Sequence, residues 1–181
     1  MHKKLLALFC GLASIQVAIA HDDDQTEELK AYTPGVAIVE IEAEKLSNSN
    51  GEVEIVIAAI DLYGFDSPAS TPADKQKVQE QSNKVVSQIA NIVVFQNGAC
   101  DFSLEELKPL KNKEYKDGKV HYYFKAEFDV TCAQPFNTQR INLNLPLVAP
   151  TVKNVNLITE MADAPKTNKP VLSSAQGIEL K

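Results

Sequence analysis

The stretch EVEIVIAAIDLY at residues 52–63 constrains the fold more than any other part of the sequence. Its first half alternates charged and apolar residues, and both faces become apolar from Val56 to Ile60. A period of two is typical of a β-strand, and a strand that is apolar on both faces is typical of the middle of a covered sheet. The stretch therefore predicts the central strand of a β-rich domain.

A second strand is expected just before this stretch. From Gly35 to Ala43, apolar residues occupy the odd positions from 37 onward, and the even positions from 40 onward carry glutamate. This pattern indicates a strand with one buried face. The turn-forming cluster SNSNG at residues 47–51 leads directly into the central stretch, so the two strands should form an antiparallel hairpin.

The period of the apolar residues changes after Gly64. Thr71 offers a capping hydroxyl, Pro72 suits the first helical position, and Asp74 stands at the third. Apolar residues then recur at helical spacing: Val78, Val85, Val86, Ile89 and Ile92 or Val93. The sequence therefore predicts one amphipathic helix over about 72–92, lying across a face of the sheet.

Two cysteines mark the next pair of strands. Apolar residues occupy the even positions of residues 100–104 and 120–132, so Cys100 and Cys132 both fall on inward faces. If these strands pair antiparallel about a loop centred near Lys116, Cys100 lies opposite Cys132 and inward residues meet inward residues. The register favours a long loop over about 109–119. If export removes an N-terminal leader that contains Cys10, Cys100 and Cys132 remain, and this even number favours a disulfide between them. Two buried free thiols are the alternative.

The remaining segments complete a fold of the α+β class. Residues 141–147 alternate apolar and polar residues, and Pro146 among them indicates a sheet edge or a strand end. Residues 152–159 and 171–180 predict two more strands, separated by the polar stretch 163–170. We expect a mostly antiparallel sheet of about seven strands with the one helix packed on it. One core should contain Ile55, Ile57, Val85, Ile89, Phe102, Phe124 and Phe128.

The first twenty residues are typical of a secretory leader. A basic start, MHKK, precedes an apolar run from Leu5 to Ala20, and small residues at Ala18 and Ala20 favour cleavage before His21. A retained membrane anchor is the alternative, but the run is short for a span. The expected location is therefore the periplasm, or the medium beyond the outer membrane, with no membrane anchor.

Cleavage would leave a flexible acidic tail at residues 21–32 and a single β-rich domain at residues 33–181. Loss of Lys3 and Lys4 changes the net charge from −6 to −8 with histidine neutral, which disfavours nucleic acid as a partner. No Gly-x-Ser-x-Gly, His-Glu-x-x-His or glycine-rich phosphate loop occurs in the sequence. The chain is therefore expected not to be an enzyme.

The order of these elements resembles a known family. The sequence GFDSP at residues 64–68, GAC at 98–100 and CAQP at 132–135 occur in the order found in ZrgA-type zinc-uptake proteins of Gram-negative bacteria. The resemblance covers nearly the whole mature chain. It implies a periplasmic zinc-binding accessory to a zinc importer, with a β-rich fold and no enzymatic activity. The implied partner is an importer component or another exported protein.

The chain lacks histidines that this family usually carries. Members place histidines just before the glycine that opens the first strand, where this chain has AYTPG at residues 31–35. They often have a histidine where this chain has Ser67, and a histidine-rich loop where it has KNKEYKDGK at residues 111–119. Each difference removes imidazoles, which are preferred zinc ligands.

Few metal-ligand candidates remain in the mature chain: His21, Asp22, Asp23, Asp24, His121, Asp117 and Glu114. After cleavage, His21 would offer its α-amine and its imidazole, with three carboxylates beside them, which predicts weak zinc binding. The alternative is a disordered acidic tail. His121 is expected on the polar face of its strand near Asp117 and Glu114, where a solvated histidine is the alternative to a ligand.

Two classes of function follow. The first is an exported binding protein of the zinc-uptake type with a reduced or lost metal site, for which zinc is the only cofactor suggested. The second is a secreted or periplasmic interaction protein that keeps the scaffold and has no metal role.

Overall fold

The computed structural model describes residues 33–114 and 118–180. Among these residues it contains the following helices and strands: β1 (Val36–Ala43), β2 (Asn50–Ala58), α2 (Ala59–Tyr63), α3 (Pro72–Ile92), β3 (Val93–Phe95), β4 (Cys100–Glu114), β5 (Val120–Cys132), β6 (Arg140–Leu143), β7 (Asn154–Met161), β8 (Ala164–Leu172) and β9 (Ile178–Glu179). The expected α+β class is confirmed.

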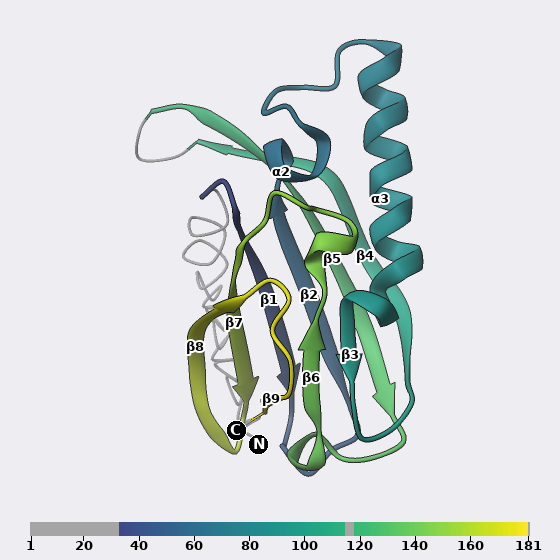
Figure 1. The fold of residues 1–181 in the computed structure, drawn as a ribbon, viewed down its shortest axis with the longest axis vertical. Coiled ribbons are helices and arrows are strands. Elements are labelled where there is room, and N and C mark those ends of the chain that lie inside the picture. Colours follow the sequence, from purple (N-terminus) through teal and green to yellow (C-terminus); the bar gives the residue numbers. More distant parts are fainter. Residues whose placement is uncertain (1–32, 115–117, 181) are drawn as a thin grey trace, which may run out of the picture.

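The strands form two sheets. The large sheet has six strands in the order β4-β5-β2-β1-β7-β8, and the small sheet has three in the order β3-β6-β9. All neighbouring strands are antiparallel except β1 and β7, which are parallel. Figure 1 shows α3 and the small sheet on one side of the large sheet, and residues from all three share one core.

The predicted central strand is confirmed, but it is shorter than expected. β2 pairs antiparallel with β1 on one side and with β5 on the other. The chain then leaves the sheet, and residues 59–63 form the one-turn helix α2 instead of continuing the strand. Its buried residues Ala59, Leu62 and Tyr63 stand at helical spacing, and Gly64 ends it with φ of 77°, a conformation that glycine adopts readily.

The predicted long helix is confirmed at both ends. α3 begins with a capping box, in which the Thr71 hydroxyl accepts from the Asp74 N–H and the Asp74 carboxylate accepts from the Thr71 N–H, each at 3.1 Å. Val85, Ile89 and Ile92 are buried in the core. Because these signals are local, the helix could be predicted from the sequence alone.

The predicted cysteine pairing is also confirmed. Cys100 lies opposite Cys132 in the β4·β5 ladder, and the two form a disulfide. The expected loop over 109–119 is wrong, because β4 continues to Glu114. The register shifts between Leu104 and Glu106 and again between Lys108 and Lys111, so each irregularity adds one residue to β4. These shifts allow a long hairpin without placing inward residues opposite outward ones.

The stretch 163–170 was expected to be a connection, but all of it except Asp163 lies in strand β8. β8 is the last strand of the large sheet and is largely exposed, so it needs no alternation of apolar residues. Pro165 and Pro170, with Lys166 and Lys169, are residues that blunt a sheet edge against pairing with another chain. In the described residues, none of the helices has the length and apolar content needed to cross a membrane.

The seven residues expected to share a core do so. Six are buried and Phe102 is partly buried against them. Phe128 is 1% exposed, and its ring lies nearly perpendicular to the Phe102 ring at a centroid distance of 6.5 Å. We therefore expect Phe128→Ala to lower the free energy of unfolding by about 3 to 5 kcal/mol, measured by urea denaturation. An unchanged midpoint would contradict this packing.

The disulfide closes a long loop, since its cysteines have a sequence separation of 32. In the chain-entropy model, a loop of that length is worth about 3 to 4 kcal/mol. A Cys100→Ser/Cys132→Ser variant should lose that much stability in the same denaturation assay. Thiol counting on the denatured, unreduced mature protein should find no free thiol, and finding two would refute the bond.

Candidate functional site

One face of the large sheet, opposite the core, carries a row of carboxylates. Asp129 on β5 lies directly opposite Glu52 on β2, Glu52 opposite Glu42 on β1, and Glu42 opposite Glu160 on β7. We call these four residues the acidic row and this side of the sheet the outer face. Like charges directly opposite each other on neighbouring strands destabilise a sheet. The acidic row is therefore an arrangement that packing alone does not favour.

Two lysines neutralise the neighbouring glutamates of the outer face and one member of the acidic row, Glu160. Lys125 Nζ lies 2.8 Å from Glu54 Oε2 and 2.9 Å from Glu127 Oε1. Lys166 Nζ lies 3.1 Å from Glu40 Oε1 and 2.6 Å from Glu160 Oε2. Each lysine is thus held between two carboxylates, and we call these two arrangements the lysine clamps. In the described part of the chain no ion pair joins a lysine or arginine to Glu42, Glu52 or Asp129.

This crowding shifts the pKa values of several carboxyl groups. The pKa of Glu42 is raised to about 7 by burial first and then by the charges of Glu40, Glu160 and Glu52, against a smaller opposing effect of Lys166. The outer face therefore binds protons more strongly than isolated glutamates would.

In the lysine clamp at Lys125, the pKa values of the two carboxyl groups are shifted in opposite directions. Burial raises the pKa of Glu54 to about 7, although Lys125 opposes the shift. For Glu127, burial acts in the same direction, but the hydrogen bonds from Lys125 and Glu54 outweigh it and lower the pKa. The pKa of Lys125 itself is raised, because its carboxylate partners outweigh the effect of burial. The clamp therefore holds its lysine charged.

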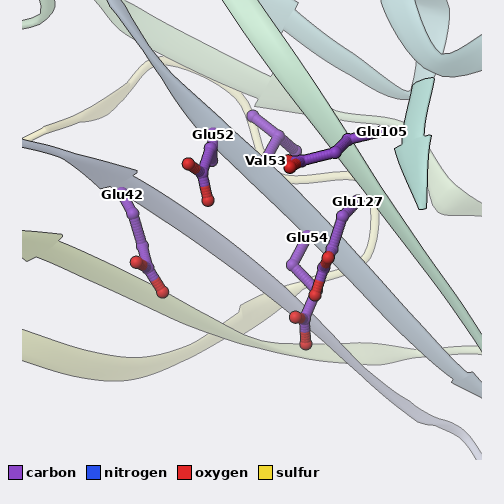
Figure 2. Close-up of a pocket in the computed structure, with 6 residues that line it drawn as sticks. All are labelled: Glu42, Glu52, Val53, Glu54, Glu105 and Glu127. Atoms are coloured by element: carbon purple, nitrogen blue, oxygen red, sulfur yellow. The ribbon is translucent and has the colours of Figure 1, made fainter. Parts of the chain in front are cut away.

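The outer face is hollowed beside the acidic row. A depression of about 150 Å³ is lined by Glu42, Glu52, Val53, Glu54, Glu105 and Glu127. Figure 2 shows these side chains, whose glutamates come from β1, β2, β4 and β5. A second depression of about 390 Å³ also contains Glu52 and extends to Asp129. Ligand oxygens of Glu52, Glu105 and Asp129 all lie within 4.8 Å of one another. Such an all-carboxylate set attracts cations but lacks the nitrogen and sulfur ligands typical of tight zinc sites.

A second arrangement involves the GFDSP segment. Gly64 ends α2, the Phe65 ring stacks on Tyr63 at 5.9 Å, and Asp66 follows. Asp66 Oδ2 lies 2.6 Å from His121 Nδ1, and Asp66 Oδ1 accepts a hydrogen bond of 2.7 Å from the Tyr122 N–H. The segment thus connects the end of α2 to the start of β5.

His121 is not the solvated strand histidine that the sequence allowed as the alternative to a ligand, because only 6% of it is exposed. Asp66 was not found by sequence reasoning, since 55 residues separate it from His121 and no local pattern pairs them. A carboxylate at one imidazole nitrogen is the usual support of a zinc-binding histidine. With Nδ1 facing Asp66, a metal would have to bind at Nε2.

The other predicted ligands are placed as follows. Glu114 lies opposite Val120, one position from the Lys113–His121 pair, so it points to the other face of the hairpin. His21, Asp22, Asp23, Asp24 and Asp117 lie outside the described residues. Both described cysteines are in the disulfide. Within residues 33–114 and 118–180, no group of three or more potential metal ligands includes His121.

The two arrangements are too far apart to share one metal ion. Eight positions separate His121 from Asp129 along β5, which is about 26 Å at about 3.3 Å per residue. The acidic row was not predicted, because it depends on which strands are neighbours. In particular, the parallel pairing of β1 with β7 brings Glu160 beside Glu42.

Comparison with protein families identifies the family of the chain. A model of the ZrgA family of zinc uptake proteins matches residues 31–169, which is more than half of the chain. The match contains the GFDSP segment, both cysteine strands and all four members of the acidic row. No curated protein matches the chain.

The raised pKa of Glu42 predicts a pH-dependent stability. A carboxyl group with a raised pKa binds more protons in the folded than in the unfolded state, so its contribution to stability falls as pH rises from 4.5 to about 7. Glu42→Gln should therefore stabilise the protein near pH 8, by up to about 1 kcal/mol, with little effect near pH 4.5. Urea denaturation at both pH values measures this.

Glu80→Gln provides the control for this experiment, because Glu80 is exposed on α3 and far from the outer face in the fold. It should change stability by less than about 0.5 kcal/mol at either pH. A Glu42→Gln variant that is destabilised near pH 8 would contradict the repulsion across the acidic row.

Proposed function

Because the chain belongs to the ZrgA family of zinc uptake proteins, we propose that it is an exported, non-enzymatic accessory protein that binds zinc as cargo. The leader at residues 1–20 supports export, with cleavage before His21 and a periplasmic location. The proposed partner is a component of the zinc importer. The acidic charge of the mature chain argues against nucleic acid in that role.

The observation that supports this function best is the pairing of Asp66 with His121. Asp66 belongs to the family segment GFDSP, and its carboxylate holds the one described histidine at 2.6 Å. A histidine oriented by a carboxylate is suited to offer its other nitrogen to zinc. His121 is therefore the described residue that we propose as a zinc ligand.

The proposed site is a reduced one. A tight zinc site uses three or four protein donors, and the described residues supply no such set around His121. The cysteines are joined to each other, so they offer no thiolate. The remaining imidazole is that of His21, which we propose binds zinc together with the α-amine created by cleavage and with Asp22, Asp23 and Asp24. Such a site depends on the processed N-terminus and exchanges zinc readily.

Calorimetric titration with zinc tests this proposal. Protein that begins at His21 should bind zinc with a dissociation constant weaker than about 1 µM, equivalent to about −8 kcal/mol. The affinity should fall between about pH 8 and about pH 6, because protonation of an imidazole and an α-amine removes their lone pairs. A protein that begins at Ala31 should lose most of the binding.

Two further variants separate the possible ligands. His121→Gln removes the imidazole, and Asp66→Asn keeps the imidazole but removes the charge beside it. If tight binding survives removal of residues 21–30 but is lost in His121→Gln, zinc binds at His121 and the tail proposal is wrong. If no variant or truncation changes the titration, neither histidine holds the zinc.

A further inference from the structure

The cations that the outer face holds in this structure are lysine ammonium groups. In both lysine clamps, an ammonium group lies between two glutamates of adjacent strands, at 2.6 to 3.1 Å from their oxygens. The acidic row repeats the carboxylate half of this arrangement. Its fourth member, Glu160, is paired with Lys166, but within the described residues Glu42, Glu52 and Asp129 have no basic side chain between them. The described part of the chain thus provides further carboxylate pairs of the same kind without their lysines.

We propose that the acidic row is a docking surface for a partner protein whose lysine or arginine side chains complete these pairs. The depression between Glu42, Glu52 and Glu105 is open to the outer face, and the larger depression beside Asp129 continues it. Long basic side chains would enter these depressions in the way that Lys125 and Lys166 enter the lysine clamps. Such contacts relieve the repulsion between like charges that face each other across the strands.

The spacing of the row fits a basic helix. Neighbouring strands are about 4.8 Å apart, so the four members of the row span about 14 Å across β5, β2, β1 and β7. Residues three and four apart on a helix face rise about 4.5 to 6 Å along its axis. Because Glu160 is already paired with Lys166, three positions of the row are left for a partner. A helix with lysine or arginine at positions i, i+4 and i+7 would place one cation near each of Glu42, Glu52 and Asp129 if it lies across the strands.

Other occupants fit the face less well. A second copy of this chain would bring its own acidic row, and nucleic acids and anionic lipid surfaces carry the same sign of charge. Pairing of an added strand at the neighbouring edge is disfavoured by the prolines of β8. The partner is accordingly expected to approach the face of the sheet through side chains. His121, the candidate zinc ligand among the described residues, lies about 26 Å from Asp129 along β5, and the test below is carried out without free zinc.

The test uses two alanine-based helical peptides of identical composition as probes. In one, the lysines stand at i, i+4 and i+7 on one face, and in the other they are distributed around the helix. Binding to the full mature protein is measured by fluorescence anisotropy with a chelator present, at about 50 mM salt. The one-face peptide should bind at least about fivefold more tightly than its isomer, because only it can place a lysine at each of Glu42, Glu52 and Asp129 at once.

Matched charge variants locate the contact. Glu42→Gln/Glu52→Gln should weaken binding of the one-face peptide at least about tenfold, whereas Glu80→Gln/Glu114→Gln, which removes the same charge elsewhere, should stay within about twofold. The proposal is overturned if both double variants weaken binding equally, or if both peptides bind equally well, since either result would indicate attraction to net charge alone. Absence of binding by both peptides would also overturn it.

Discussion

The position of β2 in the middle of the large sheet sets most of the structure. Its odd residues Val53, Ile55 and Ile57 are fully buried in the core, and the pairing with β1 and β5 fixes which residues of those strands join them. Because neighbouring residues of a strand point to opposite faces, the same register sends Glu52 and Glu54 to the outer face. The acidic row is therefore a direct consequence of the register that builds the core. The contributions of the two faces to stability are unequal. A buried aromatic side chain in the core is worth about 3 to 5 kcal/mol, whereas a like-charged cross-strand pair on the outer face costs less than about 1 kcal/mol.

Sequence reasoning succeeded where the signal was local. The capping box before α3, the alternation in β1 and β5, and the opposition of Cys100 to Cys132 each depend on residues close in sequence or on a single hairpin. It failed where long-range pairing or local irregularity decided the outcome. The bulges that lengthen β4, the parallel neighbours β1 and β7, and β8 at an exposed edge have no distinctive local pattern. For the same reason, the sequence predicted neither the pairing of Asp66 with His121 nor the acidic row, whose members come from four separate strands.

The structure gives a physical reason for each residue of the GFD sequence. Gly64 adopts the left-handed conformation that ends α2, Phe65 stacks on Tyr63, and Asp66 receives both the Tyr122 N–H and the His121 ring. Tyr63 in turn hydrogen-bonds through its hydroxyl group to Ser82 of α3 and to the Pro109 carbonyl of β4. One short segment thus joins the central strand, the long helix and the hairpin. The segment that carries the family resemblance therefore connects these elements next to His121, the proposed zinc ligand.

The most direct test of zinc as cargo is the zinc content of the protein as the cell makes it. Protein recovered from the periplasm of cells that export it, without added metal, would be compared by atomic emission with a His21→Ala/His121→Ala variant that has the same fold by circular dichroism. We expect bound zinc in the unaltered protein and a clear loss of it in the variant, because these are the only imidazoles that remain after cleavage of the leader. Equal zinc in the two proteins, or none in either, would contradict the proposed function.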